Sequence, residues 1–111
     1  MKVIPTKDFQ REAKKLGKRY KSIRSDIAVL GLSLLENPTL GTGIGQGCYK
    51  IRLAITSKNK GKSGGARVIT HVRVVQDTVF LLSIYDKSEQ EDIADDELNQ
   101  RLTTLDEQPL A

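Results

Sequence analysis

The chain has 111 residues, of which 38% are hydrophobic and 29% charged, a size and composition typical of one folded domain. Cys48 is the only cysteine, which excludes an internal disulfide and a zinc site built from several thiolates. No stretch approaches the roughly 18 apolar residues of a membrane span. No apolar run follows Lys2 as it would in a signal peptide, so we expect a protein of the cytoplasm.

The net charge of +4 is unevenly distributed along the chain. Residues 1–73 carry 16 Lys and Arg against 4 Asp and Glu, whereas residues 74–111 carry 2 against 10. A strongly basic segment over residues 1–73, followed by an acidic segment over residues 74–111, predicts that the basic segment binds an anionic partner. The alternative interpretation is a solvated surface on which charge is merely uneven.

The first third of the chain predicts a short strand and two helices. Val3 to Pro5 favours a strand at a sheet edge, because proline has no N–H to donate to a neighbouring strand. A helix over about 7–18, capped by Thr6, and a second over about 22–36 follow, with a break expected near 17–20. Apolar residues recur at helical spacing on one face of each helix: Phe9, Ala13, Leu16, then Ile23, Ile27, Leu30, Leu34. We therefore expect an antiparallel helical hairpin.

The middle of the chain predicts loops on either side of an amphipathic strand. Residues 41–47, GTGIGQG, have the composition of a flexible connection. Residues 48–55 then alternate, with apolar side chains on one face and Lys50 and Arg52 on the other. Residues 57–65, SKNKGKSGG, form a basic loop.

The last third predicts two strands and a C-terminal helix. Residues 66–75 and 78–85 favour strands separated by a tight turn, and the second is the more apolar, which indicates a central position. Ser88 and Glu91 have the spacing of a capping box for a short helix. A final helix over about 95–105 carries Leu98, Leu102 and Leu105.

These elements predict a single α+β domain over residues 1–111 with the order β-α-α-β-β-β-α, ending in an acidic helical tail from about residue 88. Strands joined by short loops form an antiparallel meander, and the helical hairpin packs on one face of the sheet. The opposite face carries basic side chains from two neighbouring strands: Lys50, Arg52, Arg67 and His71.

Two sequence segments resemble nucleotide-binding loops without meeting their requirements. The glycines of GTGIGQG do not follow G-x-G-x-x-G, and a strand follows them rather than a helix. Gly61-Lys62-Ser63 resembles the end of a phosphate-binding loop, but Thr56 stands where the first glycine is needed. With a single His and a single Cys, and with the carboxylates crowded into 86–97, we expect neither a metal nor another cofactor.

The remaining constellation is cationic, and its chemistry suits RNA cleavage. Cleavage without a metal needs a base for the 2′-OH proton, cations for the charged phosphorane and an acid for the leaving 5′ oxygen. Arginine suits the stabilisation of the phosphorane, because its planar guanidinium can bind a phosphate through two N–H groups and stays charged. A lysine among other cations releases its proton more readily, so it can serve as base or acid. The same residues could instead bind phosphates without catalysis.

Three segments carry a family resemblance: Gly47-Cys48-Tyr49-Lys50-Ile51-Arg52-Leu53, Gly64-Gly65-Ala66-Arg67-Val68-Ile69 and Leu81-Leu82-Ser83-Ile84-Tyr85-Asp86-Lys87. In this order they resemble the RelE/ParE superfamily of toxin–antitoxin toxins, in particular its RelE/HigB-like branch. The resemblance implies neutralisation by a cognate antitoxin, entry into the ribosomal A site and cleavage of messenger RNA there. The basic pair of the family's first meander strand corresponds to Lys50 and Arg52.

The resemblance also implies a role for each basic residue. Lys50 is the candidate base, Arg52 and Arg67 the candidate stabilisers of the phosphorane, and Lys87 the candidate acid. The family's C-terminal stacking tyrosine has no counterpart, and Tyr85 is the possible substitute. Further RNA contacts are expected from Lys58, Lys60, Lys62, His71, Arg73 and the helical Arg11, Lys14, Lys15 and Lys18. The alternatives are a ParE-like poison of DNA gyrase and a non-catalytic RNA-binding protein of the same fold.

Overall fold

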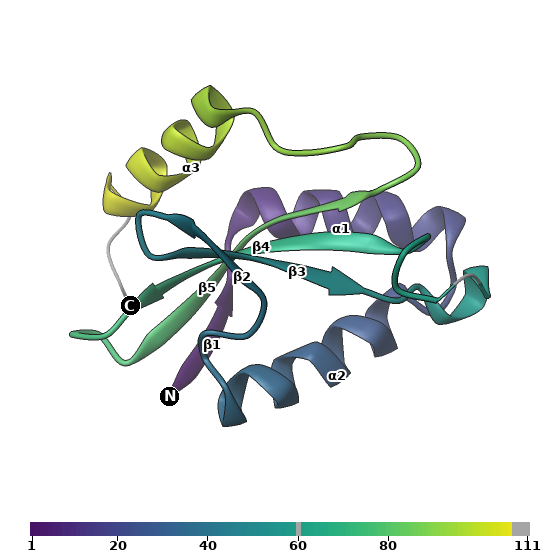
Figure 1. The fold of residues 1–111 in the computed structure, drawn as a ribbon, viewed down its shortest axis with the longest axis horizontal. Coiled ribbons are helices and arrows are strands. Elements are labelled where there is room, and N and C mark those ends of the chain that lie inside the picture. Colours follow the sequence, from purple (N-terminus) through teal and green to yellow (C-terminus); the bar gives the residue numbers. More distant parts are fainter. Residues whose placement is uncertain (60, 108–111) are drawn as a thin grey trace.

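A computed structural model describes residues 1–59 and 61–107. In this part of the chain five strands form one sheet in the order β1-β5-β4-β3-β2, in which β1 runs parallel to β5 and all other pairs are antiparallel (Figure 1). The elements are β1 (Lys2–Pro5), α1 (Lys7–Arg19), α2 (Ile23–Glu36), β2 (Thr42–Gly45), β3 (Cys48–Leu53), the 3-10 helix η1 (Thr56–Lys58), β4 (Ala66–Arg73), β5 (Thr78–Asp86) and α3 (Asp95–Glu107). The predicted α+β fold with its meander is confirmed.

The helical hairpin forms where its caps and apolar spacing predict it. The side chain of Thr6 accepts a hydrogen bond from the Phe9 amide, which satisfies one of the free N–H groups at the start of α1. The Thr6 hydroxyl also donates to the Leu81 carbonyl and so fixes the start of α1 on β5. α1 continues through Gly17 to Arg19, so the break predicted near 17–20 lies at its end.

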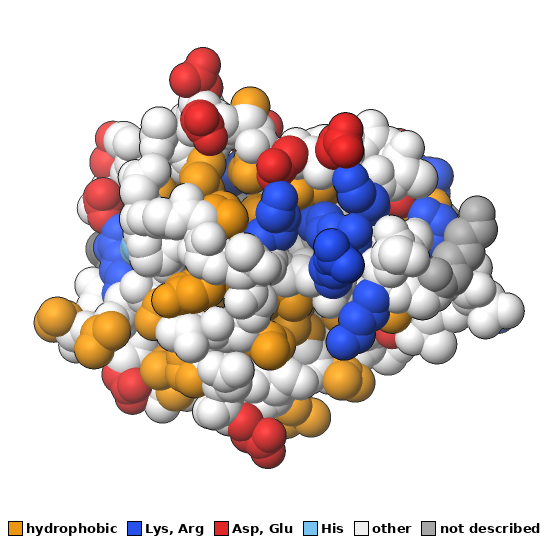
Figure 2. Space-filling model, viewed as in Figure 1, with side chains coloured by type: hydrophobic (Ala, Val, Ile, Leu, Met, Phe, Trp, Pro, Cys, Tyr) orange, Lys and Arg blue, Asp and Glu red, His pale blue; other side chains and the backbone are white. Residues whose placement is uncertain are grey.

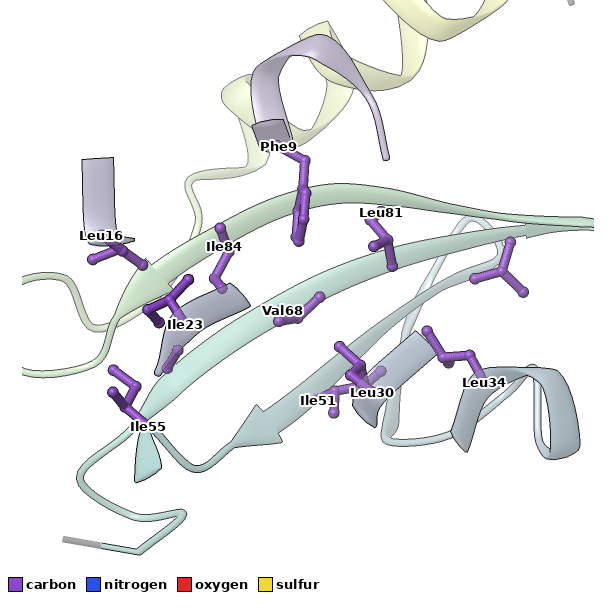
Figure 3. Close-up of a cluster of buried hydrophobic side chains, with 12 residues drawn as sticks. Phe9, Leu16, Ile23, Leu30, Leu34, Ile51, Ile55, Val68, Leu81 and Ile84 are labelled. Atoms are coloured by element: carbon purple, nitrogen blue, oxygen red, sulfur yellow. The ribbon is translucent and has the colours of Figure 1, made fainter. Parts of the chain in front are cut away.

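Two apolar cores lie on the two faces of the sheet, which is sandwiched between α2 and α3 in Figure 1. Buried side chains of α1 and α2 meet Ile51, Val68 and Ile84 of the strands in the first core (Figure 3). In the second core, Leu98, Leu102 and Leu105 of α3 cover the buried side chains Cys48, Ile69, Phe80, Leu82 and Tyr85. The C-terminal helix therefore occupies part of the face on which the sequence predicted exposed basic residues.

The glycine-rich segment 41–47 is not the flexible connection that its composition predicted. Residues 42–45 form β2, which pairs with β3 along the sheet edge. Gln46 and Gly47 connect the two strands, and both have positive φ angles, 57° and 72°. Positive φ at both loop residues is the requirement of a type I′ turn, one of the two favoured turns of two-residue hairpin loops. The prediction was wrong because glycine has little strand propensity, whereas here the backbone hydrogen bonds to β3 form the strand.

Two further predictions need correction. Ser88 does not begin a short helix, because its amide and hydroxyl both donate to the Asp86 carboxylate and residues 87–89 form turns. β5 is an interior strand with every residue buried, but β4 holds the middle position in the sheet.

A bulge in β5 determines which side chains face α3. The register with β4 shifts between Ile69 and Thr70, where Leu82 is the additional residue of β5. β1 pairs with β5 only as far as Leu81, so the edge beyond it needs other partners. Arg101 of α3 donates to the Leu82 carbonyl at 2.8 Å, and Glu12 of α1 accepts from the Ile84 amide at 3.2 Å. The bulge places Tyr85 on the α3 face, opposite Arg67 of β4.

Candidate RNA-binding site

The central strands bring the predicted basic residues together beside the C-terminal segment. Arg52 of β3 lies directly opposite Arg67 of β4 in the antiparallel register, and Lys50 is two residues away on the same face of β3. Like charges directly opposite each other destabilise a sheet, by roughly 0.2–1 kcal/mol for a cross-strand pair. A pair of arginines in this position is therefore better explained by an anionic ligand than by folding.

All four predicted catalytic residues line one hollow of about 440 Å³. Lys50, Arg52, Arg67 and Lys87 share this hollow with Lys62 from the loop before β4, and we call it the cationic hollow. Its remaining wall consists of Leu40, Gly41, Thr42, Ile51 and Glu91. Figure 2 shows the gathering of Lys and Arg side chains over this part of the molecule, with acidic side chains along its upper border.

The two arginines of the cationic hollow differ in how firmly they are held. Arg67 is only 6% exposed, and its guanidinium donates to the carbonyls of Lys62 and Ala66 at 3.0 and 3.1 Å. It is thus fixed in place and connects the loop to the start of β4. Arg52 is exposed and has no acidic partner among residues 1–59 and 61–107. Its guanidinium is available to a ligand phosphate.

Glycines allow the backbone to pack closely around the cationic hollow. A Cβ atom at Gly41 would lie 2.5 Å from the Lys50 carbonyl oxygen, and one at Gly65 would lie 2.2 Å from the Leu53 carbonyl oxygen. Both distances are shorter than any real Cβ contact, so a larger residue would push β3 away from its neighbours. The close approach keeps Lys50 and Arg67 at the same hollow.

Two carboxylates from the segment before α3 contact the lysines of the cationic hollow. The Lys50 ammonium lies 3.1 Å from Asp92, and the Lys87 ammonium lies 3.4 Å from Glu91. Asp92 is 59% exposed and Glu91 is 91% exposed, so these are surface ion pairs that an incoming polyanion can replace. Neither acid was predicted to belong to the site, because both lie among the carboxylates crowded into residues 86–97.

Tyr85 is buried in the second core, under α3, rather than exposed for stacking. Its ring is 5% exposed and its hydroxyl donates to Asp92. Burial, followed by the nearby Asp92 charge, raises the pKa of Tyr85 to about 12. Burial of Asp92 acts to raise the pKa of that carboxyl, but hydrogen bonds from the Ile93 amide and from Lys50 lower it overall. Asp92 is therefore ionised near neutral pH.

Lys58 is held by a carboxylate instead of pointing into the hollow. Its ammonium lies 2.9 Å from the Asp86 carboxylate, which also accepts from the Tyr20 hydroxyl at 2.7 Å. Burial opposes ionisation of Asp86, but the hydrogen bonds from Tyr20, Lys58 and Ser88 hold its pKa well below the usual range. These contacts connect the end of α1, η1 and the end of β5. They support the loop that carries Lys62.

His71 and Arg73 lie under α3, away from the cationic hollow. Arg73 forms an ion pair with Asp106 of α3 and donates to the His71 ring at 3.1 Å. Burial, then the charge of Arg73, lowers the pKa of His71. The buried Cys48 thiol lies 3.6 Å from the same ring, and burial raises its pKa to about 11, which favours the protonated thiol near neutral pH.

The remaining predicted RNA contacts lie elsewhere. Arg11, Lys14, Lys15 and Lys18 are exposed on α1, on the face of the sheet opposite the cationic hollow, and Lys60 lies outside the described residues. Across residues 1–59 and 61–107, no three His, Cys, Asp or Glu side chains are grouped as they would be around a metal ion. In the same residues, no helix is both long enough and apolar enough to cross a membrane.

The fold and the site define a small α+β domain with a shallow cationic hollow suited to phosphate groups. The family model of the RelE toxin of the RelE/RelB toxin–antitoxin system matches residues 1–107. The chain belongs to this family of toxins.

Solved structures of the Escherichia coli toxin RelE share the fold. A doubly substituted RelE in the free state is 20% identical with a TM-score of 0.62, and the match covers 93% of this chain and 95% of that one. The isolated RelE toxin is 19% identical with a TM-score of 0.58 and coverages of 94% and 97%. The substituted RelE in complex with a peptide of the antitoxin RelB is 20% identical with a TM-score of 0.59 and coverages of 89% and 90%.

Proposed function

We propose that this toxin is an endoribonuclease that acts in the cytoplasm on messenger RNA in the ribosomal A site and so inhibits translation. The observation that carries the proposal is the convergence of Lys50, Arg52, Arg67 and Lys87 on one hollow. A gyrase poison would not need this set of cations. A protein that merely binds RNA would not need a fixed, buried arginine such as Arg67 among them.

In the proposed reaction the cationic hollow binds the phosphate at which the RNA is cleaved. Lys50, once released from Asp92, is the proposed base that accepts the 2′-OH proton, and the 2′ oxygen forms a bond to the adjacent phosphorus. The guanidinium groups of Arg52 and Arg67 stabilise the charge that develops on the phosphorane oxygens. The bond from phosphorus to the 5′ oxygen breaks while Lys87 donates a proton to that oxygen. The products are a 2′,3′-cyclic phosphate and a 5′-OH end.

The proposal includes a cognate antitoxin as the protein partner. Family membership supports it, and so does the RelE complex with an antitoxin peptide. A second protein that covers or displaces the acidic segment before α3 would alter the access of RNA to Lys50 and Lys87.

A translation reaction with purified ribosomes and a defined message tests the proposal. Mapping of RNA ends should show new 5′-OH ends at A-site codons with the wild-type protein and none with Arg67→Ala. Because Arg67 also donates hydrogen bonds to the carbonyls of Lys62 in the loop and of Ala66 in β4, Arg67→Lys serves as a second variant that retains a cation. Intact message together with DNA-damage signalling in growing cells would favour a gyrase poison. Intact message with salt-sensitive RNA binding would favour a non-catalytic RNA-binding protein.

A further inference from the structure

A buried carboxylate lies at the start of the turn that carries Lys87. Asp86 is the last residue of β5 and is 2% exposed. Its Oδ1 atom accepts hydrogen bonds from the Lys58 ammonium at 2.9 Å and from the Ser88 amide and hydroxyl at 3.0 and 2.8 Å. Its Oδ2 atom accepts from the Tyr20 hydroxyl at 2.7 Å. Donors from three separate segments of the chain therefore converge on one side chain.

The stability of the fold is a poor reason for such a cluster. The side chains of Asp86 and Lys58 are 0% and 13% exposed. Removing two opposite charges from water costs free energy that their attraction often does not return, and apolar side chains of similar size frequently stabilise a fold as well or better. Hydrogen bonds, in contrast to apolar contacts, fix the direction of the groups they join. The cluster therefore indicates that the geometry at the end of β5 matters.

The hydrogen bonds around Asp86 determine where Lys87 lies. The Asp86 carbonyl accepts from two later amides, those of Glu89 and Gln90, at 3.0 and 3.1 Å. The Lys87 amide donates to the Gly65 carbonyl at 3.1 Å, which attaches the turn to the loop before β4. Both the side chain and the backbone of Asp86 thus hold the turn together. From this turn the Lys87 side chain reaches the cationic hollow.

The Lys87 side chain itself is held only weakly. It is 31% exposed, and its ammonium contacts the carboxylate of Glu91, which is 91% exposed. A surface ion pair of this kind contributes little to fixing a side chain. The direction of Lys87 is therefore set by the backbone turn, and the turn is held by Asp86. In an enzyme, a displacement of a reacting group by about 1 Å can lower the rate roughly 100-fold.

We propose that Asp86 is a positioning residue that holds Lys87 within reach of the 5′ oxygen as this oxygen leaves. The role rests on the endoribonuclease activity proposed above. Because its side chain is fully buried, Asp86 acts through Lys87 rather than on the RNA. Lys58 balances the charge of Asp86, and Tyr20 orients its second carboxylate oxygen. Lys58, which was expected from the sequence to contact RNA, thus acts on the turn instead.

A double-mutant cycle in the full-length protein tests this role. The measurement is the single-turnover rate of message cleavage on purified ribosomes at saturating protein. Asp86→Asn should lower this rate by about ten-fold or more, because the proton donor is misplaced, with little change in the half-saturating protein concentration. In a Lys87→Ala background Asp86→Asn should have no further effect, since coupled residues are not additive. In an Arg52→Ala background the loss should persist.

A sulfur-substituted message separates proton donation from a general loss of structure. Sulfur in place of the 5′ oxygen at the cleaved linkage gives a thiolate as the leaving group. Because thiols are far more acidic than alcohols, this group needs no proton donor in order to leave. Asp86→Asn and Lys87→Ala should both cleave this message at nearly the wild-type rate. A general loss of structure would lower the rate on both messages.

Asp26→Asn is the matched control. Asp26 is 8% exposed and accepts hydrogen bonds from the Thr56 amide and hydroxyl at 3.0 and 2.6 Å and from the Ser22 hydroxyl at 2.8 Å. It is thus a second buried carboxylate that holds η1, but these partners lie in η1 and at the start of α2 rather than in the turn of Lys87. Asp26→Asn should lower the melting temperature and leave the cleavage rate of the folded protein unchanged.

Amide hydrogen exchange measures the turn independently of cleavage. The Lys87 amide should exchange about ten-fold faster in Asp86→Asn than in the wild type, whereas amides in the middle of β4 should not change, because only the turn opens. Tyr20→Phe keeps the carboxylate and should show smaller changes in both rate and exchange, which keeps the test possible if Asp86→Asn does not fold.

Three results would overturn the positioning role while wild-type cleavage is intact. They are a wild-type rate in Asp86→Asn, a loss that persists in the Lys87→Ala background, and unchanged exchange of the Lys87 amide. Absence of cleavage by the wild-type protein would instead overturn the proposed function, and the catalytic role of Asp86 with it.

Discussion

The two faces of the sheet are covered by helices that are held in different ways. α1 and α2 pack through a continuous apolar core in which Phe9, Ile23 and Leu34 are almost completely buried. α3 combines a smaller apolar contact with ion pairs through Arg73 and Arg101. Beyond the N-terminal end of α3 the sheet is left open, and the cationic hollow lies there. The comparison indicates that the first face maintains the fold, whereas the second exposes a charged site next to a helix attached partly by charge.

Leucine truncation on each face gives the largest expected difference in stability. Leu34 is 0% exposed and Leu102 is 9% exposed. Leu34→Ala should lower the free energy of unfolding by about 4 kcal/mol, because it leaves a cavity in the continuous core, and Leu102→Ala by about 2 kcal/mol. Urea unfolding followed by circular dichroism measures both values. Equal losses would show that α3 contributes as much to the fold as the hairpin does.

Removal of Arg101 tests whether charge attaches α3. Its guanidinium is buried and donates to Glu12, Glu97 and the Leu82 carbonyl, so Arg101→Ala leaves Glu12 without its partner. The expected loss is about 3 kcal/mol of unfolding free energy. Arg101→Met, which keeps the aliphatic volume, should recover part of it. A loss below about 1 kcal/mol, the value typical of surface ion pairs, would argue against this role.

The Asp86 cluster should make stability depend on acid pH. The pKa of this carboxyl is lower in the folded protein than in the unfolded chain, where it is about 3.9. Its contribution is therefore present above pH 3.9 and is lost as the pH falls through the folded-state pKa. Asp86→Asn should flatten the pH dependence of the melting temperature below about pH 4. An unchanged slope in this variant would contradict the assignment.

The smallest expected effect comes from the exposed ion pair at the cationic hollow. Asp92→Asn should change the free energy of unfolding by less than about 1 kcal/mol, because Asp92 is 59% exposed. If the proposed RNA cleavage is correct, removal of this competing carboxylate should reduce by about two-fold the protein concentration needed for half-maximal cleavage. Reduced cleavage would instead give Asp92 a direct part in the reaction.

The sequence predicted the elements whose side-chain pattern follows from burial, and it failed where backbone geometry or distant contacts decide. The helical hairpin and strands β3, β4 and β5 follow from apolar periodicity. β2 has too few side chains to show such a pattern, since three of the residues in and around it, Gly41, Gly43 and Gly45, are glycines. The burial of Tyr85 depends on the bulge at Leu82, which strict alternation does not predict.

The candidate site was predictable in its basic residues but not in its acidic ones. Alternation along β3 placed Lys50 and Arg52 on one face, and the structure brings them together with Arg67 and Lys87. The contacts of Asp92 with Lys50 and of Asp86 with Lys58 join residues 42 and 28 positions apart in the chain. Local patterns carry no information about such pairs.

The most direct test of the central claim is the single-turnover rate of message cleavage on purified ribosomes by Arg52→Ala. Arg52 is exposed, so the variant should keep the wild-type melting temperature. The loss of one stabilising donor predicts a rate lower by about 100-fold or more. Lys2→Ala, an exposed cation on β1 away from the hollow, should cleave at the wild-type rate. Cleavage by Arg52→Ala at the wild-type rate would show that the cationic hollow is not the site of the reaction.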